Sequence, residues 1–235
     1  MPRFYCEQPI IENSTLALDA RVAQHVRVLR VREGEAITLF DGDGGEVPAS
    51  LTLIDKRNVE AHTTTRISVE RELSREITLY CGLIANDRFD WLIQKATELG
   101  AHAIQPIYSE RAQRIPGDVA KRVEHWRGVV IAACEQCGRN RLPMVSAPIS
   151  FSEAMTVVQP QSSVLLDANA DTDGDFSVAV SSTALSVFVG PEGGFTSTEL
   201  VLLRKRCDHK LRIGRTVLRA ETAAISSLAW LGSLQ

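Results

Sequence analysis

The pattern of apolar and polar positions along the chain changes character near residue 72. Before that point, short apolar runs alternate with turn-forming residues, as at residues 41–45, where a run with three glycines separates two strand-like segments. One short helical pattern lies at about residues 20–28. Residues 1–72 are therefore predicted to form a small β-barrel-like domain.

From residue 73 to residue 235, apolar strands alternate with amphipathic helices. Strands are predicted at residues 77–83, 103–108, 163–166, 185–189 and 210–213. Helices are predicted at residues 118–137 and through residues 223–231, and Asp87 is predicted to cap another helix that ends at Gly100. This alternation is typical of a largely parallel sheet, so the predicted fold class is α/β with a smaller N-terminal β domain.

The most informative segment is residues 187–196, which read VFVGPEGGFT. An apolar strand stops at a glycine-rich loop, after which Thr196 and Glu199 have the spacing of a capping box, with Phe195 and Leu200 at hydrophobic-staple positions. Ligands of open α/β sheets bind beyond the carboxyl ends of the strands, so this loop is a candidate binding loop. A tight strand-to-helix turn without a ligand is the alternative.

A second loop near the end of the chain has a similar setting. A strand is predicted to end at Gly214 and a helix to begin near Ala220. The loop between them offers backbone polar groups, the apolar Val217 and Leu218, and the cationic Arg219. Together, two such loops could enclose a flat, partly apolar cofactor through backbone contacts.

The net charge of −3 argues against a general polyanion binder, but local basic clusters qualify that conclusion. The first cluster comprises Arg21, His25, Arg27, Arg30 and Arg32, the second spans residues 204–219, and the third is Arg139 and Arg141 on either side of Asn140. Each cluster is explained either as a solvated face or as a contact for a nucleic acid.

The cysteine content and the absence of long apolar runs favour a cytoplasmic protein. The five cysteines are scattered and odd in number, which fits a reducing compartment better than a disulfide framework. No apolar run approaches the roughly 20 residues that span a bilayer, and the N-terminus has no signal-peptide core.

Other familiar chemistries have little support in the sequence. Cys134 and Cys137 have metal-ligand spacing, but no second pair accompanies them, so no metal site is predicted. The 190–194 loop lacks the Lys-Ser/Thr of a phosphate-binding P-loop, and neither a nucleophile elbow nor a dinucleotide fingerprint is present.

Four motifs occur in the order typical of one enzyme family. They are KATELG at residues 95–100, EQCGRNR at 135–141, GPEGGF at 190–195 and LRAETA at 218–223. Together with HVRVLR at residues 25–30, they make nearly the whole chain resemble the RsmE family. Members of that family are SPOUT-class methyltransferases that modify N3 of a uridine in the 16S rRNA of the small ribosomal subunit.

This resemblance implies a PUA-like, RNA-binding β-barrel at residues 1–72 and a SPOUT α/β domain at residues 73–235 whose last segments thread a trefoil knot, an exception to the rule against knots. It also implies a homodimer with the site near the subunit interface. The cofactor would be S-adenosylmethionine, held by Leu166, Gly190, Pro191, Glu192, Gly193, Ile213, Gly214, Val217 and Leu218. Contacts to 16S rRNA are expected from Arg21, His25, Arg27, Arg30, Arg32 and Arg141.

The methylation of N3 requires loss of its proton, which spreads negative charge onto O2 and O4 of the base. A nearby guanidinium would stabilise that charge, and Arg219 or Arg139 is expected in this role, with Asn140 orienting the base. Glu221 is a candidate general base, and a carboxylate that only stabilises a helix start is the alternative reading.

Two other functions stay open at this point: methylation of another RNA position, such as a ribose 2′-oxygen, and a non-catalytic role in RNA binding or assembly. The glycines at 190, 193 and 214 argue against the non-catalytic role, because a lost cofactor site would tolerate side chains there. The chain departs from the family pattern at Arg215-Thr216, where many members have Pro-Arg, and at Ala220, where many have threonine.

Overall fold

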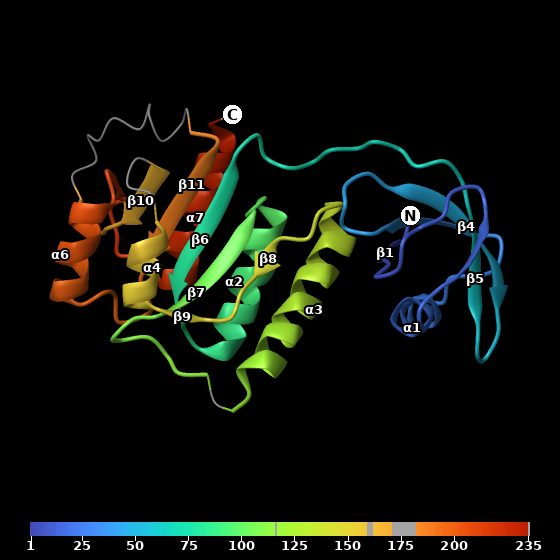
Figure 1. Ribbon diagram of the computed structural model, residues 1–235, viewed down its shortest axis with the longest axis horizontal. Coiled ribbons are helices and arrows are strands. Elements are labelled where there is room, and N and C mark those ends of the chain that lie inside the picture. Colours follow the sequence, from blue (N-terminus) through green and yellow to red (C-terminus); the bar gives the residue numbers. More distant parts are fainter. Residues whose placement is uncertain (116, 159–161, 171–181, 235) are drawn as a thin grey trace. The chain divides into compact units, whose positions relative to one another are not determined.

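The computed structural model describes residues 1–115, 117–158, 162–170 and 182–234 (Figure 1). Its contacts divide the chain into two compact units, residues 1–72 with 131–142, and residues 73–130 with 143–235. Helix α3 (Val119–Cys137) contributes residues to both units. Among the described residues, every helix is too short or too polar to cross a membrane.

The first unit is built on a five-stranded sheet in the order β1-β3-β4-β5-β2. Strands β1 and β3 are parallel, and the other neighbours are antiparallel. The strands are β1 (Arg3–Tyr5), β2 (Thr15–Ala17), β3 (Ala36–Phe40), β4 (Val47–Ile54) and β5 (Val59–Thr63). The predicted N-terminal β domain is confirmed, although the apolar pattern does not predict the short strands β1 and β2.

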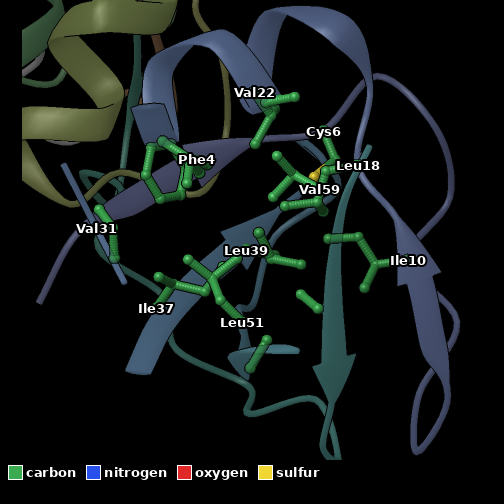
Figure 2. Close-up of a cluster of buried hydrophobic side chains, with 14 of the residues drawn as sticks. Phe4, Cys6, Ile10, Leu18, Val22, Val31, Ile37, Leu39, Leu51 and Val59 are labelled. Atoms are coloured by element: carbon green, nitrogen blue, oxygen red, sulfur yellow. The ribbon is translucent and has the colours of Figure 1, made fainter. Parts of the chain in front are cut away.

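Helix α1 (Ala20–Val28) lies where the sequence predicts it. Asp19 caps it, because its carboxylate accepts a hydrogen bond from the N–H of Val22 at 2.8 Å. Figure 2 shows Val22 among apolar side chains of the sheet region, including Cys6, Leu18 and Val59. The apolar face of α1 therefore completes the core of this unit.

An ion-pair network around Glu46 joins distant segments of the first unit. Oε2 of Glu46 accepts hydrogen bonds from Nη1 of Arg3 at 2.6 Å and from Nη1 of Arg71 at 3.0 Å. Arg3 also donates to Oδ1 of Asn140 at 2.6 Å, and Arg71 donates to the carbonyl of Gly138 at 2.9 Å. Burial raises the pKa of Glu46, but the hydrogen bonds from Arg71 and Arg3 outweigh it and hold the pKa below the ordinary value of 4.5.

We expect the substitution Glu46→Gln to reduce the acid sensitivity of the protein. Because the folded-state pKa of Glu46 lies below its unfolded-state value, its charge stabilises the fold above the unfolded-state pKa, and that contribution is lost as the pH falls through the folded-state pKa. Urea-unfolding midpoints from about pH 7 to about pH 3 should therefore fall less steeply for Glu46→Gln than for the wild type. The exposed Glu35→Gln is the control, and parallel curves for Glu46→Gln and the wild type would contradict the assignment.

The second unit contains a parallel sheet in the order β12-β10-β11-β6-β7-β8, with β9 also paired to β7. The predicted parallel sheet is therefore confirmed. Its strands are β6 (Glu76–Gly82), β7 (Ala103–Tyr108), β8 (Met144–Val145), β9 (Ile149–Ser150), β10 (Ser163–Leu166), β11 (Ala184–Val189) and β12 (His209–Leu211). Since all the strands are parallel, their carboxyl ends meet at one edge of the sheet.

Helices pack against the sheet of the second unit (Figure 1). They are α2 (Asn86–Glu98), α4 (Phe151–Val157), α6 (Ser197–Arg206) and α7 (Ala220–Ser233). The first part of α3 also belongs to this unit, and its Trp126 packs on Phe89 of α2. Helices α4 and α6 share a buried cluster with Phe188 of β11 and Leu165 of β10. Helix α7 contacts β6, β11 and α2. The central strands are thus covered by apolar side chains from several helices.

Two sequence expectations in this unit need correction. Helix α2 begins at Asn86, and its N-cap is Ala85, whose carbonyl accepts from the N–H of Phe89 at 2.9 Å. Asp87 lies in the first turn instead, where the helix dipole favours its negative charge. Strand β12 ends at Leu211, so Ile213 lies in the following loop and is free to face a ligand. Gly100 ends α2 as predicted, with a φ of +87° that glycine adopts readily.

Candidate cofactor site

A cavity of about 350 Å³ lies where the loops after β10, β11 and β12 meet the start of α7. This is the edge of the sheet where the strands end, the position at which open α/β sheets bind ligands. Of the residues expected to hold the cofactor, those that line the cavity are Leu166, Gly190, Pro191, Glu192, Gly193, Ile213, Val217 and Leu218. The two loops singled out in the sequence are therefore brought together by the fold.

Gly214 is the one expected cofactor residue outside the lining of the cavity. It has a φ of +71°, which lies in the left-handed region that favours glycine. A Cβ added at this position would meet nothing within 4 Å, so backbone conformation, not lack of space, explains the glycine. Gly214 shapes the loop that carries Val217 and Leu218 to the cavity.

Several lining residues have no clear signal in the sequence. The turn after β10 contributes Asp167, Ala168 and Asn169, and the start of α7 contributes Ala220 and Ala223. For Asp167, Ala168 and Asn169, the only indication in the sequence is that they follow the end of a predicted parallel strand. Small side chains at the start of α7 leave room in the cavity.

Asp167 fixes the shape of the turn after β10. Its Oδ2 forms an ion pair with Nη2 of Arg204 at 2.6 Å, and its Oδ1 accepts from the N–H of Asn169 at 2.9 Å. The carboxylate is almost fully buried, with an exposed side-chain fraction of 4%. One cation of the 204–219 cluster is thus paired with a buried carboxylate of the cavity wall.

The capping box predicted at the end of the glycine-rich loop is confirmed. The N–H of Glu199 donates to Oγ1 of Thr196 at 3.3 Å, and the N–H of Thr196 donates to Oε2 of Glu199 at 2.8 Å. Phe195 and Leu200, the predicted staple pair, belong to the same apolar cluster. These contacts fix the end of the loop where it enters α6.

The beginning of the loop packs tightly on the neighbouring strand. A Cβ added to Gly82, the last residue of β6, would lie 2.5 Å from Cδ and 2.6 Å from the backbone nitrogen of Pro191. A Cβ on Gly190 would lie 3.0 Å from the backbone nitrogen of Phe195. Both glycines are therefore required by close backbone approach, which sets the position of the cavity wall.

Arg219 and Glu221 lie at the start of α7, beside the cavity. Arg219 is the N-cap residue, its side chain is exposed, and its neighbours Leu218 and Ala220 line the cavity. Glu221 is 7% exposed and lies in the first turn of the helix. Within the described residues, its Oε2 has no hydrogen-bond partner.

Arg139 and Asn140 are buried in the first unit. Nε of Arg139 donates to Oε1 of Glu72 at 2.9 Å, and the guanidinium also pairs with the other carboxylate oxygen of Glu72. Nδ2 of Asn140 donates to the carbonyl of Val69 at 3.1 Å, and its Oδ1 accepts from Arg3. These contacts show that both side chains link segments of the first unit. Their role in catalysis stays a prediction.

The expected RNA-binding residues all lie in the first unit. Arg21 and His25 both face Glu135, at 3.2 Å and 3.3 Å, and Arg27 donates to the carbonyl of Asp55 at 3.0 Å. Arg30 and Arg32, beyond the end of α1, have exposed side chains. Arg141 is half exposed and donates from Nε to Oε2 of Glu70 at 3.1 Å. Arg30 and Arg32 are thus exposed cations without an ion pair to any of the described residues.

Of the two free cysteines with metal-ligand spacing, Cys134 is buried and Cys137 is partly exposed. Sγ of Cys134 donates to the carbonyl of Arg141 at 3.6 Å, and burial raises the pKa of Cys134 to about 12. Such a thiol is protonated at neutral pH and is a poor metal ligand. Within the described residues, no three metal-ligating side chains form a group.

Comparison with known proteins shows the family of the chain. An RNA methyltransferase domain model matches residues 71–232, and an RNA methyltransferase PUA domain model matches residues 18–63. Ribosomal RNA small subunit methyltransferase E from Bacillus subtilis is 31% identical, over 97% of this chain and 95% of that protein. The protein of the same name from Synechocystis is 32% identical, over 97% of this chain and 75% of that protein.

Solved structures give the same relationship. Ribosomal RNA small subunit methyltransferase E from Neisseria gonorrhoeae, bound to S-adenosylmethionine, has a TM-score of 0.92 and 36% identity, over 100% of this chain and 98% of that one. A methyltransferase from Legionella pneumophila with bound S-adenosylmethionine has a TM-score of 0.91 and 33% identity, over 98% and 96% of the two chains. With the cavity at the ends of its parallel strands and this agreement over the whole length, the chain belongs to the ribosomal RNA small subunit methyltransferase E family.

Proposed function

We propose that this protein uses S-adenosylmethionine to methylate N3 of a uridine in the 16S rRNA of the small ribosomal subunit. The observation that carries the proposal is the cavity between the 190–193 and 213–218 loops. Relatives named for small-subunit rRNA methylation match nearly the whole chain, and the two similar structures described above are bound to S-adenosylmethionine. The choice of uridine N3 follows the family resemblance of the sequence.

The residues of the cavity suit this cofactor. The volume of the cavity, about 350 Å³, lies at the lower end of the usual range for small-molecule sites, roughly 300–1,000 Å³. Leu166, Ile213 and Leu218 offer apolar surface, and the close-packed glycine loop offers backbone polar groups next to them. These residues would hold the cofactor, which supplies a methyl group activated by its attachment to a sulfonium.

The protein must orient the base and stabilise the charge that develops on it. Loss of the N3 proton leaves negative charge on O2 and O4, and we assign its stabilisation to the guanidinium of Arg219. The side chain of Arg219 is exposed, and both of its chain neighbours line the cavity, whereas Arg139 is already paired with Glu72. Glu221 is the candidate proton acceptor, and a purely structural role at the helix start is the alternative.

The wider assembly is part of the same proposal. We place RNA binding on the first unit, where Arg30 and Arg32 leave their charge exposed. We also propose that the protein forms a homodimer, that it is located in the cytoplasm, and that its second unit contains a trefoil knot. In support of the knot, β10 lies between β11 and β12 in the sheet, although it precedes both in the chain, and α7 returns to contact β11 and β6.

A labelled-methyl transfer experiment tests the substrate class. Small and large ribosomal subunits that lack their own modifications are incubated separately with the protein and methyl-labelled S-adenosylmethionine. We expect label in 16S rRNA of the small subunit alone. Label in the large subunit would contradict the proposed substrate, and cofactor binding without any transfer would favour a non-catalytic assembly factor.

A further inference from the structure

We propose that Arg111 is a positioning residue for the cofactor, because it holds the 190–193 loop in the shape that forms one wall of the cavity. This inference rests on the proposed function, since it concerns the same site. Arg111 follows β7, does not line the cavity, and belongs to none of the basic clusters in the sequence.

The loop needs support from outside because its own residues provide little. Gly190, Gly193 and Gly194 have no side chains to pack, and glycine backbones lose the most conformational freedom on ordering. Within the loop, the N–H of Gly194 donates to the carbonyl of Pro191 at 2.8 Å. The shape of residues 191–193 therefore depends on contacts with other segments.

Arg111 makes two contacts with the far end of this loop. Its Nη1 donates to the carbonyl of Gly193 at 2.9 Å. Its aliphatic stem lies against the same glycine, since a Cβ added to Gly193 would be 3.3 Å from Cδ and 3.4 Å from Cβ of Arg111. The space next to Gly193 is thus filled by the Arg111 stem, while the carbonyl is held by its guanidinium.

The segment that carries Arg111 is itself fixed. The N–H of Glu110 donates to Oε1 of Glu199 at 2.9 Å, and the N–H of Gln113 donates to the carbonyl of Leu83 at 2.9 Å. Glu199 is the buried carboxylate that also closes the capping box with Thr196. Arg111 therefore reaches the loop from a rigid base that is tied to the same helix start.

A second, weaker contact holds the other side of the loop. Oε1 of Glu192 accepts from the N–H of Ala85 at 3.3 Å and pairs with Nη1 of Arg88 at 3.4 Å. Exposed side-chain fractions of 41% for Arg88 and 30% for Glu192 make this a surface pair, which contributes little. Arg111 is therefore expected to matter more for the loop than Arg88.

The test measures S-adenosylmethionine affinity by calorimetry and, in parallel, the steady-state constants for methyl transfer. Arg111→Met keeps an unbranched apolar stem but removes the hydrogen bond to Gly193. We expect it to raise the Kd for S-adenosylmethionine about 5-fold, with kcat at saturating cofactor and KM for the RNA substrate near the wild-type values. Arg111→Lys should recover part of the affinity, because an ammonium still donates to a carbonyl.

The matched control is Arg114→Met, which changes an exposed arginine of the same segment that stacks on Tyr108 and should leave the Kd unchanged. Wild-type affinity in Arg111→Met would overturn the inference. So would a raised KM for RNA with an unchanged cofactor Kd, which would make Arg111 an RNA contact. If the wild-type protein binds no S-adenosylmethionine, the proposed function fails, and this inference with it.

Discussion

Replacing Arg219 by alanine is expected to lower kcat for methyl transfer by roughly 100- to 1,000-fold, the usual effect of removing one donor to a developing oxyanion. The cofactor Kd should change little, because the Arg219 side chain does not line the cavity and makes no capping hydrogen bond at the start of α7. Thermal unfolding should also be close to wild type, since the side chain is exposed. Single-turnover transfer at saturating cofactor and RNA provides the measurement.

Two further variants define the cause of that loss. Arg219→Lys keeps the positive charge but not the planar donor pair, so its rate should lie between those of the wild type and Arg219→Ala. Lys205→Ala removes an exposed cation of α6 and should retain wild-type kcat. A normal kcat with a raised KM for RNA in Arg219→Ala would show a phosphate contact and contradict the catalytic assignment.

The substitution Gly82→Ala is expected to weaken S-adenosylmethionine binding by roughly 10- to 100-fold. The new Cβ would lie 2.5 Å from Cδ and 2.6 Å from the nitrogen of Pro191, so either the loop or the end of β6 must move. Pro191 lines the cavity, and its displacement changes the cavity wall directly. Calorimetric titration of the cofactor gives the affinity.

Gly128→Ala is the matched control, because a Cβ at this position in α3 meets nothing within 4 Å. It should bind the cofactor normally and be slightly more stable, since alanine is favoured over glycine within helices. Unfolding midpoints of both variants separate a local change from a global one. If Gly82→Ala folds and binds the cofactor like the wild type, the close approach of Gly82 to Pro191 does not determine the shape of the cofactor site.

The parts of the site that sequence alone predicts are those encoded locally. The capping box of Thr196 and Glu199 needs residues only three positions apart, and strand ends followed by glycine indicate binding loops. Helix α4 begins with the same kind of local signal, a capping box of Ser150 and Glu153, so its start can also be predicted from the sequence. Short strands such as β8 and β9 are different, because their two residues are defined only by pairing with β7.

The parts that sequence alone does not predict depend on distant partners. Asn140 reads as a candidate for orienting a base, yet its side chain meets Arg3, which lies at the other end of the unit's sequence. Arg139 likewise pairs with Glu72 across a long sequence separation. The sequence around Arg111 gives no local signal either. Its proposed role depends on the carbonyl of Gly193, which lies 2.9 Å from Nη1 of Arg111 only in the folded chain.

The identity of the methylated nucleoside tests the central claim most directly. Unmodified small subunits are incubated with the protein and S-adenosylmethionine, and the 16S rRNA is digested to nucleosides and analysed by mass spectrometry. The proposed function predicts a new 3-methyluridine peak that is absent from the reaction without protein and strongly reduced with Arg219→Ala. A 2′-O-methylated nucleoside, or no methylated nucleoside at all, would contradict it.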